Sequence, residues 1–598
     1  MRRFIATALS VTLALGLGAC GTTGADADAA SSGGGAATAA ASDVTSKEKT
    51  VYLVKPDDTR TSTFYYVGDS DVPYVSLSDW GELMTYLMKT HVYKDQHITF
   101  ALEYSKEGNV GTLTRTDGDP YTMVCDCDAG TITFVDYDAF VRPEDDRVLL
   151  DVLSADDPHE DEDGASLFRR AKGSYERYGD ELVLDLKSYG IDMVSSGDDV
   201  LVPLQTLSDF LLSLKYVNAF DNGEDIFFVE MGGLTDGETG EPTELGELFY
   251  AVEPHDRSEA MGKFSYAELC MVFDHLYGLK DAHGIDSFEH LVAQTGTYEA
   301  LTGTDPNAAD AALFDITWQH LDDKHSGFRQ CSPLCREGLF DEMLEKIGPG
   351  RGLMSGVKMG EFYKSARAEF FPDGVPAYQE VGNTAYITFD EFLPIPKGVD
   401  YQKTPPTAEA TDTIGVVAYA YSQITREGSP VENVVLDLSC NGGGEADTAI
   451  FVISTFLGEG YGSLKNTMTG ALATGVYSVD ANLDGKFDGG DLALASKRLF
   501  CLTSPVSFSC GNFVPSVFKN SNVVTLMGRT SGGGSCVVLP ISTAYGSCMQ
   551  ISGPHRLAFT KNGSFYDIDQ GAEPDYTLAF PESYYDRASL TDYINQIR

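Results

Sequence analysis

The sequence has little positive charge. Its 598 residues include 42 Lys and Arg against 90 Asp and Glu, which gives a formal net charge of -48 at pH 7. Such a chain repels the phosphate groups of nucleic acids and other anionic surfaces, so neither is expected as a partner. The acidity would suit cationic peptides, although surface acidity more often serves solubility. The charge therefore restricts the partners without assigning a function.

Zinc-ligand patterns and long hydrophobic runs are also missing. The cysteines form no CxxC pair and the 10 histidines are not clustered, which argues against a zinc site. After residue 18, no apolar stretch is long enough to span a bilayer. The chain is too long for a single hydrophobic core, so roughly two to four domains are expected.

The N-terminus is typical of an export signal. A basic start precedes an apolar run from residue 4 to 18. The next feature, Leu-Gly-Ala-Cys at residues 17–20, resembles the lipobox of bacterial lipoproteins, in which the cysteine is diacylated after cleavage. We therefore expect residues 1–20 to be a lipoprotein signal peptide, Cys20 to carry the lipid anchor, and residues 21–50 to form a flexible tether. This predicts an extracytoplasmic protein on a bacterial membrane or cell surface; the alternative is an ordinary cleaved signal with a chance cysteine.

The cysteines permit disulfides. Of the 11 in the chain, those that follow Cys20 are even in number, and an exported chain can oxidise them. Cys331 with Cys335, and Cys536 with Cys548, are the most plausible local pairs. The complete connectivity does not follow from the sequence.

Residues 51–235 are expected to form a separate β-rich module. Two of its segments, residues 73–84 and 202–211, echo each other, since each looks like the end of a strand followed by a short, capped amphipathic helix. This duplication is similar to the strand-and-helix modules of bacterial surface proteins, including those like the copper amine oxidase N-terminal domain. The similarity implies no copper chemistry.

The rest of the chain predicts two further parts. Apolar residues recur at helical spacing in residues 266–277 and 308–321, which predicts a helical subdomain over residues 248–375. Beyond it, apolar strands alternate with helical stretches. This alternation predicts an α/β core over residues 376–598.

Two strand ends in this core carry the chemistry. Residues 434–444 have the sequence VVLDLSCNGGG, a β-branched run typical of a buried parallel strand, followed by three glycines. Glycines let backbone N–H groups approach a ligand without a Cβ in the way. Residues 502–512 place Ser509 just after a second apolar run. Together they predict an oxyanion-binding loop and a serine nucleophile on one sheet, and hence acyl-transfer chemistry such as peptide hydrolysis.

In their order, these motifs resemble the tail-specific, or C-terminal-processing, serine peptidases, a group that includes the tricorn protease core. The resemblance covers residues 260–590 and includes a strand at 384–387, a loop at 526–534 and residues 573–575. It implies an α/β catalytic domain of the tail-specific protease (crotonase-like ββα) type, with a helical N-terminal subdomain and a preceding separate α+β module. It also implies an endopeptidase whose partner is a peptide or protein substrate.

Carried over position by position, the resemblance makes Ser509 the nucleophile. The backbone N–H groups of Cys510 and of Gly442 or Gly443 would form the oxyanion hole. A helix that starts near Gly511 would favour the negative intermediate at its N-terminus. Taken alone, a serine in this position is more often a helix N-cap, but the order of the neighbouring motifs favours the nucleophile.

The assignment of the general base is less direct. Bacterial tail-specific proteases use a lysine at the position that matches Gly533 here. The tricorn-like branch uses histidine, and residues 321–328 resemble its Asp-x-His-Ser/Thr motif, which makes His325 the candidate base. Asp569 or Glu573 could orient it. The alternative is a catalytically inactive peptide-binding or surface scaffold protein on the same fold.

Residues 480–491 have the spacing of an EF-hand calcium loop, with glycine at position 6 for the turn. The predicted ligand positions 1, 3, 5, 7, 9 and 12 hold Asp480, Asn482, Asp484, Lys486, Asp488 and Asp491. The loop resembles one half of a dockerin; the alternative is an Asp/Gly-rich surface turn. Because it lies between the glycine-rich strand and Ser509, a structural Ca²⁺ could position the nucleophile. No cofactor is expected for catalysis.

Overall fold

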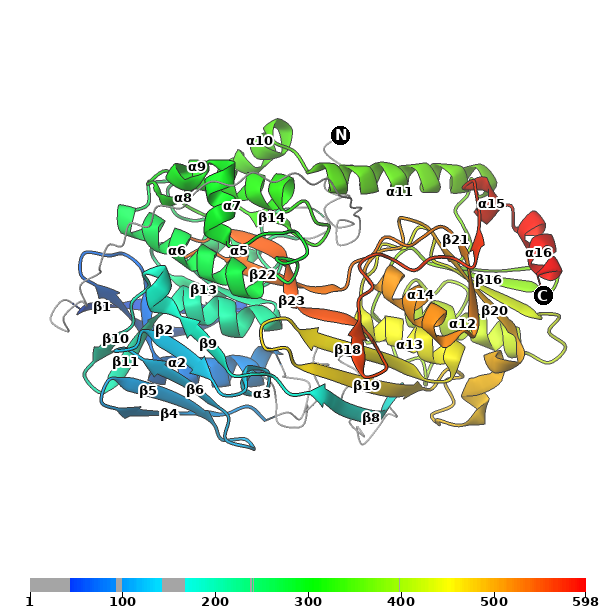
Figure 1. Cartoon of the computed structure of the whole chain (residues 1–598), viewed down its shortest axis with the longest axis horizontal. Helices are drawn as coiled ribbons and strands as arrows, with labels where there is room; N and C mark the ends of the chain where they lie inside the picture. Colours follow the sequence, from blue (N-terminus) through cyan, green and yellow to red (C-terminus); the bar gives the residue numbers. More distant parts are fainter. Residues whose placement is uncertain are drawn as a thin grey trace.

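The computed structural model describes residues 44–92, 99–141, 167–236, 239, 241–396 and 398–597. Figure 1 shows the N-terminal sheets and a layer of helices on the left and the α/β core on the right. The predicted signal peptide, with Cys20, lies outside the described residues, as does most of the predicted tether. Residues 44–50, expected as the end of that tether, instead belong to strand β1 (Val44–Leu53).

A seven-stranded sheet lies at the N-terminal end, in the order β10-β11-β3-β2-β1-β13-β12. Its strands are β1 (Val44–Leu53), β2 (Lys55–Val67), β3 (Tyr74–Ser76), β10 (Val194–Ser196), β11 (Asp199–Pro203), β12 (Val217–Asp221) and β13 (Ile226–Glu230). The two echoing segments are neighbours in it, since β3 pairs antiparallel with β11 and Val75 lies opposite Val202. Each strand leads directly into a helix, α2 (Leu77–Leu87) or α4 (Leu204–Leu207).

A second, five-stranded sheet follows the order β4-β5-β6-β7-β9, and its paired strands are all antiparallel. Its strands are β4 (Leu102–Glu107), β5 (Val110–Arg115), β6 (Thr122–Asp126), β7 (Thr131–Phe134) and β9 (Leu182–Asp185). Buried residues alternate with more exposed ones along these strands, as expected when one face of a sheet covers a core. A short helix, α3 (Tyr137–Phe140), follows β7.

These two sheets do not form the separate module that the sequence predicts. Their buried side chains belong to one cluster with those of helix α6 (Glu259–Leu276) and of two late strands, β22 (Cys536–Ser542) and β23 (Cys548–Lys561). Strand β8 (Phe168–Arg177) also leaves this region and pairs with β19 (Leu472–Val479) of the core. The expected boundary at residue 235 is therefore not a boundary of packing, because later segments cover the apolar face of the sheets.

Helices fill the stretch between the N-terminal sheets and the core. They are α5 (Glu244–Phe249), α6 (Glu259–Leu276), α7 (Phe288–Thr295), α8 (Tyr298–Thr302), α9 (Pro306–Asp315), α10 (Leu339–Lys346) and α11 (Arg351–Phe370). The long helix α11 runs along the top of Figure 1 from the helical layer to the core. Among the described helices, none combines the length and apolar character needed to cross a membrane.

The core contains a six-stranded sheet in the order β15-β16-β17-β20-β21-β25. Its strands are β15 (Tyr378–Val381), β16 (Thr384–Thr388), β17 (Asn433–Asp437), β20 (Arg498–Thr503), β21 (Val524–Gly528) and β25 (Tyr576–Thr577). All neighbours from β16 onward are parallel, and β15 alone is antiparallel. The helices of this part are α12 (Thr413–Thr425), α13 (Ala446–Leu457), α14 (Cys510–Ser521), α15 (Glu582–Tyr585) and α16 (Arg587–Gln596). The predicted α/β core is present.

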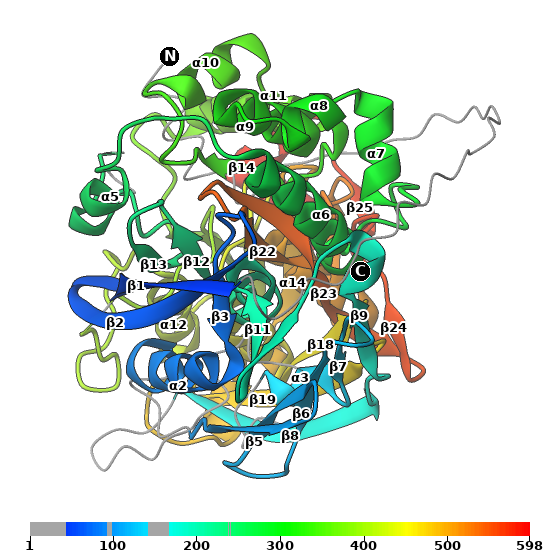
Figure 2. The same cartoon turned by 90° about the vertical axis from the view of Figure 1, so that its left-hand side faces the viewer.

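One further sheet joins the two sides of the molecule through β23. Its central order is β14-β23-β18-β19-β8, and β22 and β24 also pair with β23. The added strands are β14 (Gly327–Gln330), β18 (Gly460–Asn466) and β24 (Ser564–Tyr566). The beginning of β23 pairs with β14 and its later part with β18. Figure 2 shows β22 and β23 between α6 and the N-terminal strands β12 and β13.

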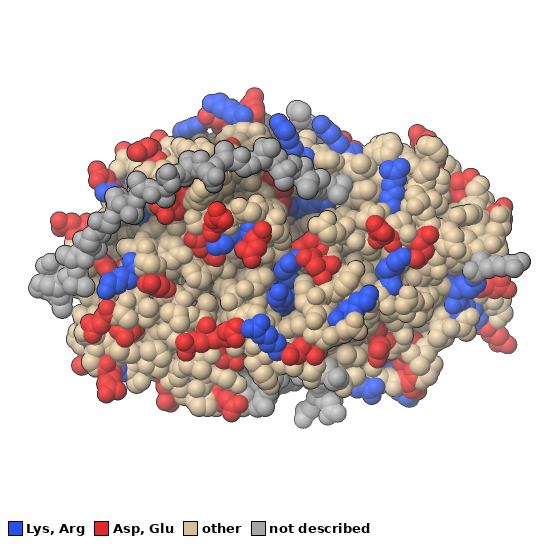
Figure 3. Space-filling model, viewed as in Figure 1, with Lys and Arg blue, Asp and Glu red and all other residues tan. Residues whose placement is uncertain are grey.

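The large negative charge is not gathered into one patch on the face shown in Figure 3. Acidic and basic side chains are interspersed there over both sides of the molecule. Among the described residues, exposed groups of opposite sign form pairs such as Lys263 with Glu259 and Lys403 with Asp400. Exposed pairs of this kind contribute roughly 0–1 kcal/mol each. On this face the acidity therefore marks no single binding surface.

Every cysteine in the described residues has a free thiol. The predicted pair Cys536–Cys548 is wrong, because the two residues lie at opposite ends of the β22–β23 hairpin. At about 3.3 Å per residue this places them ~20 Å apart, far beyond the reach of a disulfide. The second predicted pair, Cys331 and Cys335, is also unbonded, and the Cys335 thiol donates instead to Asp310 Oδ2 at 3.2 Å.

Candidate active site

Three loops meet at the carboxyl edge of the six-stranded sheet: residues 438–444 after β17, 504–509 after β20 and 529–534 after β21. They leave at one edge because their strands are parallel and adjacent. In open α/β sheets this edge is where ligands bind. The backbone hydrogen bonds that join the loops are Phe508 N–H to the Asn441 carbonyl at 3.1 Å, Gly532 N–H to the Ser507 carbonyl at 2.6 Å, and Ser509 N–H to the Gly533 carbonyl at 3.0 Å.

Ser509 has a strained backbone, with φ 54° and ψ -124°, and immediately precedes α14. A non-glycine residue in this region of φ/ψ costs about 1–3 kcal/mol and is typical of functional sites. The serine of a nucleophile elbow is strained in the same way, on a sharp turn from a strand into a helix. The Ser509 side chain makes no capping hydrogen bond to α14. The N-cap alternative therefore does not account for its hydroxyl.

Gly443 lies directly against the serine. Its φ of +114° favours glycine, and a Cβ added to it would lie 2.6 Å from Ser509 Cβ. A Cβ on Gly511 would likewise lie 2.6 Å from the Asn441 carbonyl oxygen. Both glycines are required because the two loops approach each other at backbone distance. This approach brings the predicted glycine loop and nucleophile together.

The predicted oxyanion hole is only partly available in this conformation. Gly442 N–H donates to the Asp390 carbonyl at 2.9 Å, and Gly443 N–H donates to Asn441 Oδ1, also at 2.9 Å. Both glycine donors are therefore already used, contrary to the expectation from the sequence. In the part of the chain that the structure describes, the N–H groups of Cys510 and Gly444 have no acceptor. Gly444 was not among the predicted donors.

The loop that carries His325 is held by side chains of its own and of β23. Asp323 Oδ1 accepts hydrogen bonds from the backbone N–H groups of His325 and Ser326, both at 2.9 Å. The same oxygen accepts from Ser552 Oγ at 2.8 Å. Gln550 Nε2 donates to the His325 carbonyl at 2.6 Å. The aspartate of the Asp-x-His motif thus fixes the loop to β23 and does not bond the imidazole.

His325 lies beside the residue that precedes the nucleophile. Its ring centroid is 4.7 Å from that of Phe508, and the two planes are tilted by 51°. Among the described residues, no hydrogen bond joins the imidazole to the Ser509 hydroxyl. The structure therefore brings the predicted base to the turn of residues 504–509, here called the nucleophile turn. It does not bond the base to the nucleophile. Such bonds are often long or poorly aligned before substrate binds.

The imidazole of His325 is neutral over a wide pH range. Only 3% of the residue is exposed, and burial lowers its pKa to about 4. Asp323 opposes this shift, whereas the neighbouring cations Lys324 and Arg329 add to it. A neutral imidazole has a free lone pair, which a general base requires.

The two predicted orienting carboxylates do not face the histidine. Asp569 accepts from the Ser535 backbone N–H at 2.7 Å and forms an ion pair with Arg556. Glu573 is exposed and has no hydrogen-bond partner among the described residues. Neither contacts His325, so the expectation of a carboxylate behind the base is not met here. The sequence order alone could not show that Asp569 already has two partners.

At Gly533, where a lysine was expected from the resemblance, the structure has no room for a side chain. Gly533 has φ +80°, and a Cβ there would lie 2.1 Å from the Asp569 carbonyl oxygen. No side chain fits at this position without moving the backbone. A different lysine, Lys324, lies nearby: only 7% of it is exposed, and its Nζ donates to the Gly532 carbonyl at 3.3 Å. The sequence alone does not single it out, because a lysine between an aspartate and a histidine is usually expected on the surface.

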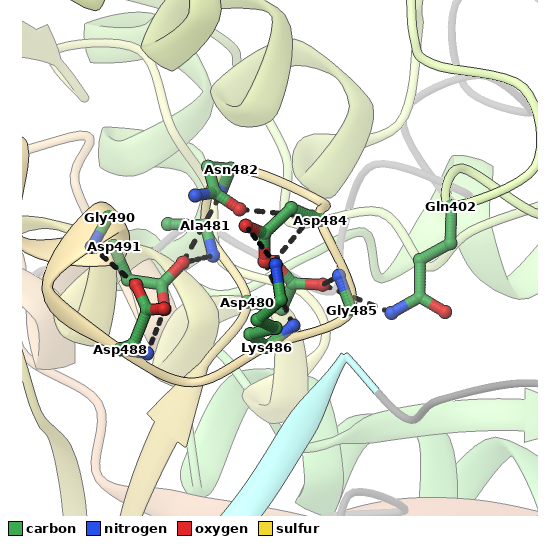
Figure 4. A network of polar contacts seen from close by, with 10 residues as sticks. All are labelled: Gln402, Asp480, Ala481, Asn482, Asp484, Gly485, Lys486, Asp488, Gly490 and Asp491. Carbon is green, nitrogen blue, oxygen red and sulfur yellow. Dashed lines mark hydrogen bonds and ion pairs between the residues drawn. The ribbon is translucent and has the colours of Figure 1, made fainter.

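The side chains predicted to bind calcium bond the backbone of their own loop (Figure 4). The bonds are Asp480 Oδ2 to Gly485 N–H at 2.8 Å, Asn482 Oδ1 to Asp484 N–H at 2.9 Å, Asp484 Oδ1 to Lys486 N–H at 3.0 Å, Asp488 Oδ1 to Gly490 N–H at 2.7 Å and Asp491 Oδ1 to Ala481 N–H at 2.8 Å. Within the described ranges, no three His, Cys, Asp or Glu side chains are grouped to hold a metal ion. Calcium binding stays a prediction.

A strained serine at the start of a helix, against a glycine-rich loop, is typical of serine hydrolases. Residues 383–578 match the model of peptidase family S41. This match confirms the tail-specific peptidase family and the tail-specific protease type of fold that the motifs predict for the catalytic core.

Three similar proteins can be compared. A curated protein of Chlamydia pneumoniae is 28% identical over 104 residues, which are 17% of this chain and 17% of that protein, so the chain spans about a sixth of its relative's length. The photosystem II D1 C-terminal processing protease is 18% identical over 36% of this chain and 51% of its own, with a TM-score of 0.25. Mature CPAF in complex with lactacystin is 11% identical over 56% and 97%, with a TM-score of 0.34.

Proposed function

We propose that this chain is a serine endopeptidase that hydrolyses peptides or protein tails, with Ser509 as nucleophile and His325 as general base. The observation that carries the proposal is the conformation of Ser509: strained, at the start of α14, with a side chain that caps nothing. Gly443 packs so closely against it that no other residue fits. Strain of this kind is retained where it serves a site.

The residues support a two-stage reaction. Ser509 Oγ attacks the carbonyl carbon of the scissile peptide bond, and its proton passes to the neutral imidazole of His325. The oxyanion that forms accepts hydrogen bonds from the N–H groups of Cys510 and of the glycine loop, at the positive end of α14. The imidazolium then gives its proton to the leaving amine, and water, activated by the same imidazole, hydrolyses the acyl-enzyme.

This mechanism requires a small rearrangement when substrate binds. His325 has to come within hydrogen-bond reach of Ser509 Oγ, about 2.6–3.2 Å. The ring of Phe508 lies against the imidazole, so the imidazole has to move relative to this ring to make the contact. One glycine N–H of residues 442–444 has to face the oxyanion, and Gly444 is the one without an acceptor in the described structure.

Labelling with a fluorophosphonate probe tests the proposal directly. The probe should attach to Ser509 of the wild-type protein, and Ser509→Ala should abolish both labelling and peptide hydrolysis. His325→Ala should slow labelling by about a hundredfold or more, since general base catalysis contributes roughly 10²–10⁴. Ser516→Ala, a buried serine on the same helix, is the matched control and should label normally. A folded wild-type protein that neither labels nor hydrolyses peptides would refute the assignment.

A binding protein without catalysis is the second candidate. It is favoured by the occupied N–H groups of Gly442 and Gly443 and by the lack of a bond between His325 and Ser509. Such a protein would bind peptides at the same edge of the sheet and leave them intact. Calorimetric titration with peptides, followed by mass spectrometry of the mixture, separates the two, because only the enzyme yields cleaved products.

We further propose that the protein is anchored through a lipid on Cys20 to the outer side of a bacterial membrane. The support is the signal-like start of the sequence and the Leu-Gly-Ala-Cys motif at residues 17–20. Expressed in a bacterial host, the full chain should sediment with membranes and incorporate a labelled fatty acid. Cys20→Ala should abolish this incorporation; labelling that persists would contradict the anchor.

A further inference from the structure

Lys324 is a buried lysine without a carboxylate partner. Its Nζ lies 4.2 Å from the centroid of the Phe508 ring and donates to the Gly532 carbonyl at 3.3 Å. Within the described residues, no carboxylate lies within ion-pair distance of it. Asp323, its sequence neighbour, uses its carboxylate for the backbone of its own loop, for Ser552 and for Tyr277. The amine thus has an aromatic ring and a carbonyl where most buried lysines have a counter-ion.

The amine contacts the nucleophile turn through the Phe508 ring, and it contacts the neighbouring 532–534 loop through the Gly532 carbonyl. Phe508 precedes Ser509 in the chain. Gly532 donates its N–H to the Ser507 carbonyl at 2.6 Å, and the next carbonyl, that of Gly533, accepts the Ser509 N–H at 3.0 Å. The amine therefore touches this turn from two directions.

The contact is close enough to constrain the loop. A Cβ added to Gly532 would lie 2.6 Å from the Pro505 carbonyl oxygen and 3.1 Å from Lys324 Nζ. A Cβ on Gly534 would lie 2.4 Å from Phe508 Cε2. The ring is thus in close contact with both the lysine and the 532–534 loop.

Burial of this amine is unfavourable for folding. Desolvation lowers the pKa of Lys324 well below its usual value. An apolar side chain of similar length, such as methionine, would fill the same space without this cost. The lysine is therefore better explained by what its amine holds than by a contribution to stability.

We propose that Lys324 is a positioning residue of the peptidase site: its amine, held between the Phe508 ring and the Gly532 carbonyl, keeps the turn of Ser509 in its strained conformation beside His325. This inference rests on the proposed function and adds a residue that acts through its neighbours and does not touch substrate.

The charges around His325 matter for the test. Asp323, Lys324 and Arg329 are the charged groups that influence its pKa. Tyr277 donates to Asp323 from α6's C-terminal end, and the Arg556–Asp569 pair lies at the neighbouring loop. Of these, only the lysine contacts the nucleophile turn. Its replacement removes both this contact and a charge near His325, so the hydrogen exchange of the turn is measured beside the labelling rate.

The experiment is a double-mutant cycle on the full chain, using Lys324→Met, Phe508→Leu and the double variant. The rate of fluorophosphonate labelling at Ser509 is measured for each, with the melting temperature and the hydrogen exchange of peptides that cover residues 505–513 and 530–535. Lys49→Met is the control, because Lys49 is also buried but pairs with Asp221 far from the site. It should lower the melting temperature and leave the labelling rate unchanged.

We expect Lys324→Met to slow labelling about tenfold or more, since misplacement by about 1 Å can cost up to a hundredfold. Its melting temperature should stay level or rise, and exchange of residues 530–535 should become faster. The double variant should be no slower than the slower single variant, because both act on one ring. Labelling within twofold of wild type for Lys324→Met, or effects that multiply in the double variant, would overturn the proposal.

Failure of the proposed function gives a different result. If wild-type protein is folded but does not label, the peptidase assignment is refuted, and hydrogen exchange alone decides the structural role. Faster exchange at residues 530–535 in Lys324→Met, with no change in the peptide from residues 44–67, would still support the positioning role. Unchanged exchange would overturn it.

Discussion

Strand β20 (Arg498–Thr503) has one polar loop before its start and another after its end. The two loops differ in the hydrogen bonds that hold them. The acidic loop of residues 480–491 precedes it and closes on itself, with carboxylate and amide side chains accepting from its own backbone. The nucleophile turn of residues 504–509 follows it, and its backbone is bonded to two other loops through Ser507, Phe508 and Ser509. The first is held mostly by its own residues, with Gln402 and Tyr421 as outside donors, and the second depends more on the fold around it.

This difference explains where strain and unused groups occur. In the acidic loop the side-chain oxygens at the ligand positions have backbone partners (Figure 4). In the nucleophile turn Ser509 is strained and its hydroxyl is left without a hydrogen bond among the described residues. A turn can hold a reactive group in such a state only when its surroundings impose the conformation. The comparison predicts that changes in the turn affect activity and changes in the loop affect stability.

The largest effect is expected from Gly443→Ala. Its new Cβ would lie 2.6 Å from Ser509 Cβ, so the nucleophile has to move. We expect the labelling rate at Ser509 to fall about a hundredfold or more, with circular dichroism unchanged. A variant that labels at the wild-type rate would show that the turn tolerates displacement, and the distinction between the two loops would fail.

A smaller but specific effect concerns pH. Because burial lowers the pKa of His325 to about 4, the base stays neutral well below pH 6.5, and the labelling rate should hold down to roughly pH 5. A histidine with its usual pKa of about 6.5 would lose activity through pH 6.5 as it becomes protonated. The rate is measured from pH 4 to 8, with circular dichroism at each pH. An acid limb centred near 6.5 would place the base in a solvated environment.

We expect Ca²⁺ to bind the acidic loop and to change the stability of the protein. If Ca²⁺ binds there, millimolar Ca²⁺ should raise the melting temperature by a few degrees, since ligand at about 100 times Kd adds ~2.7 kcal/mol. Asp480→Asn should remove this shift. Asp373→Asn, at an exposed acidic residue elsewhere, is the control and should retain it. No shift in wild-type protein, with or without prior EDTA treatment, would leave the loop as a polar turn only.

The smallest effect is expected from Gly485→Ala. Gly485 has φ 77° within the acidic loop, and alanine at a positive φ costs about 1 kcal/mol. The melting temperature should fall by one to a few degrees, and the labelling rate should stay within twofold of wild type. A loss of activity as large as that of Gly443→Ala would show that the two loops are coupled across β20.

The sequence predicted the parts of the site that depend on local pattern. A β-branched run that ends in glycines, and a serine after a second such run, are enough to place Gly443 and Ser509 on adjacent parallel strands. The start of α14 at Cys510 is within one residue of the expected helix start. These features follow from strand periodicity and glycine geometry, which depend on residues close together in the sequence.

Features that depend on long-range packing were missed. The amide of Gly442 is used by the Asp390 carbonyl, and no local pattern indicates that bond. Lys324 was overlooked because burial of a lysine depends on what covers it, here Phe508 and the 532–534 loop. Strand β8 and the shared core escaped for the same reason, since their partners lie hundreds of residues later in the chain.

The late strands β22 and β23 have a consequence for biosynthesis. Leu539, Ile541, Met549 and Ile551 complete the core that begins at Val51, so the first half of the chain leaves the ribosome before the residues that cover its apolar face exist. That half cannot reach its final state until synthesis is nearly complete. We therefore expect fragments that end before residue 536 to need a chaperone or to aggregate. The nucleophile and its histidine would then become a working pair only in a finished chain.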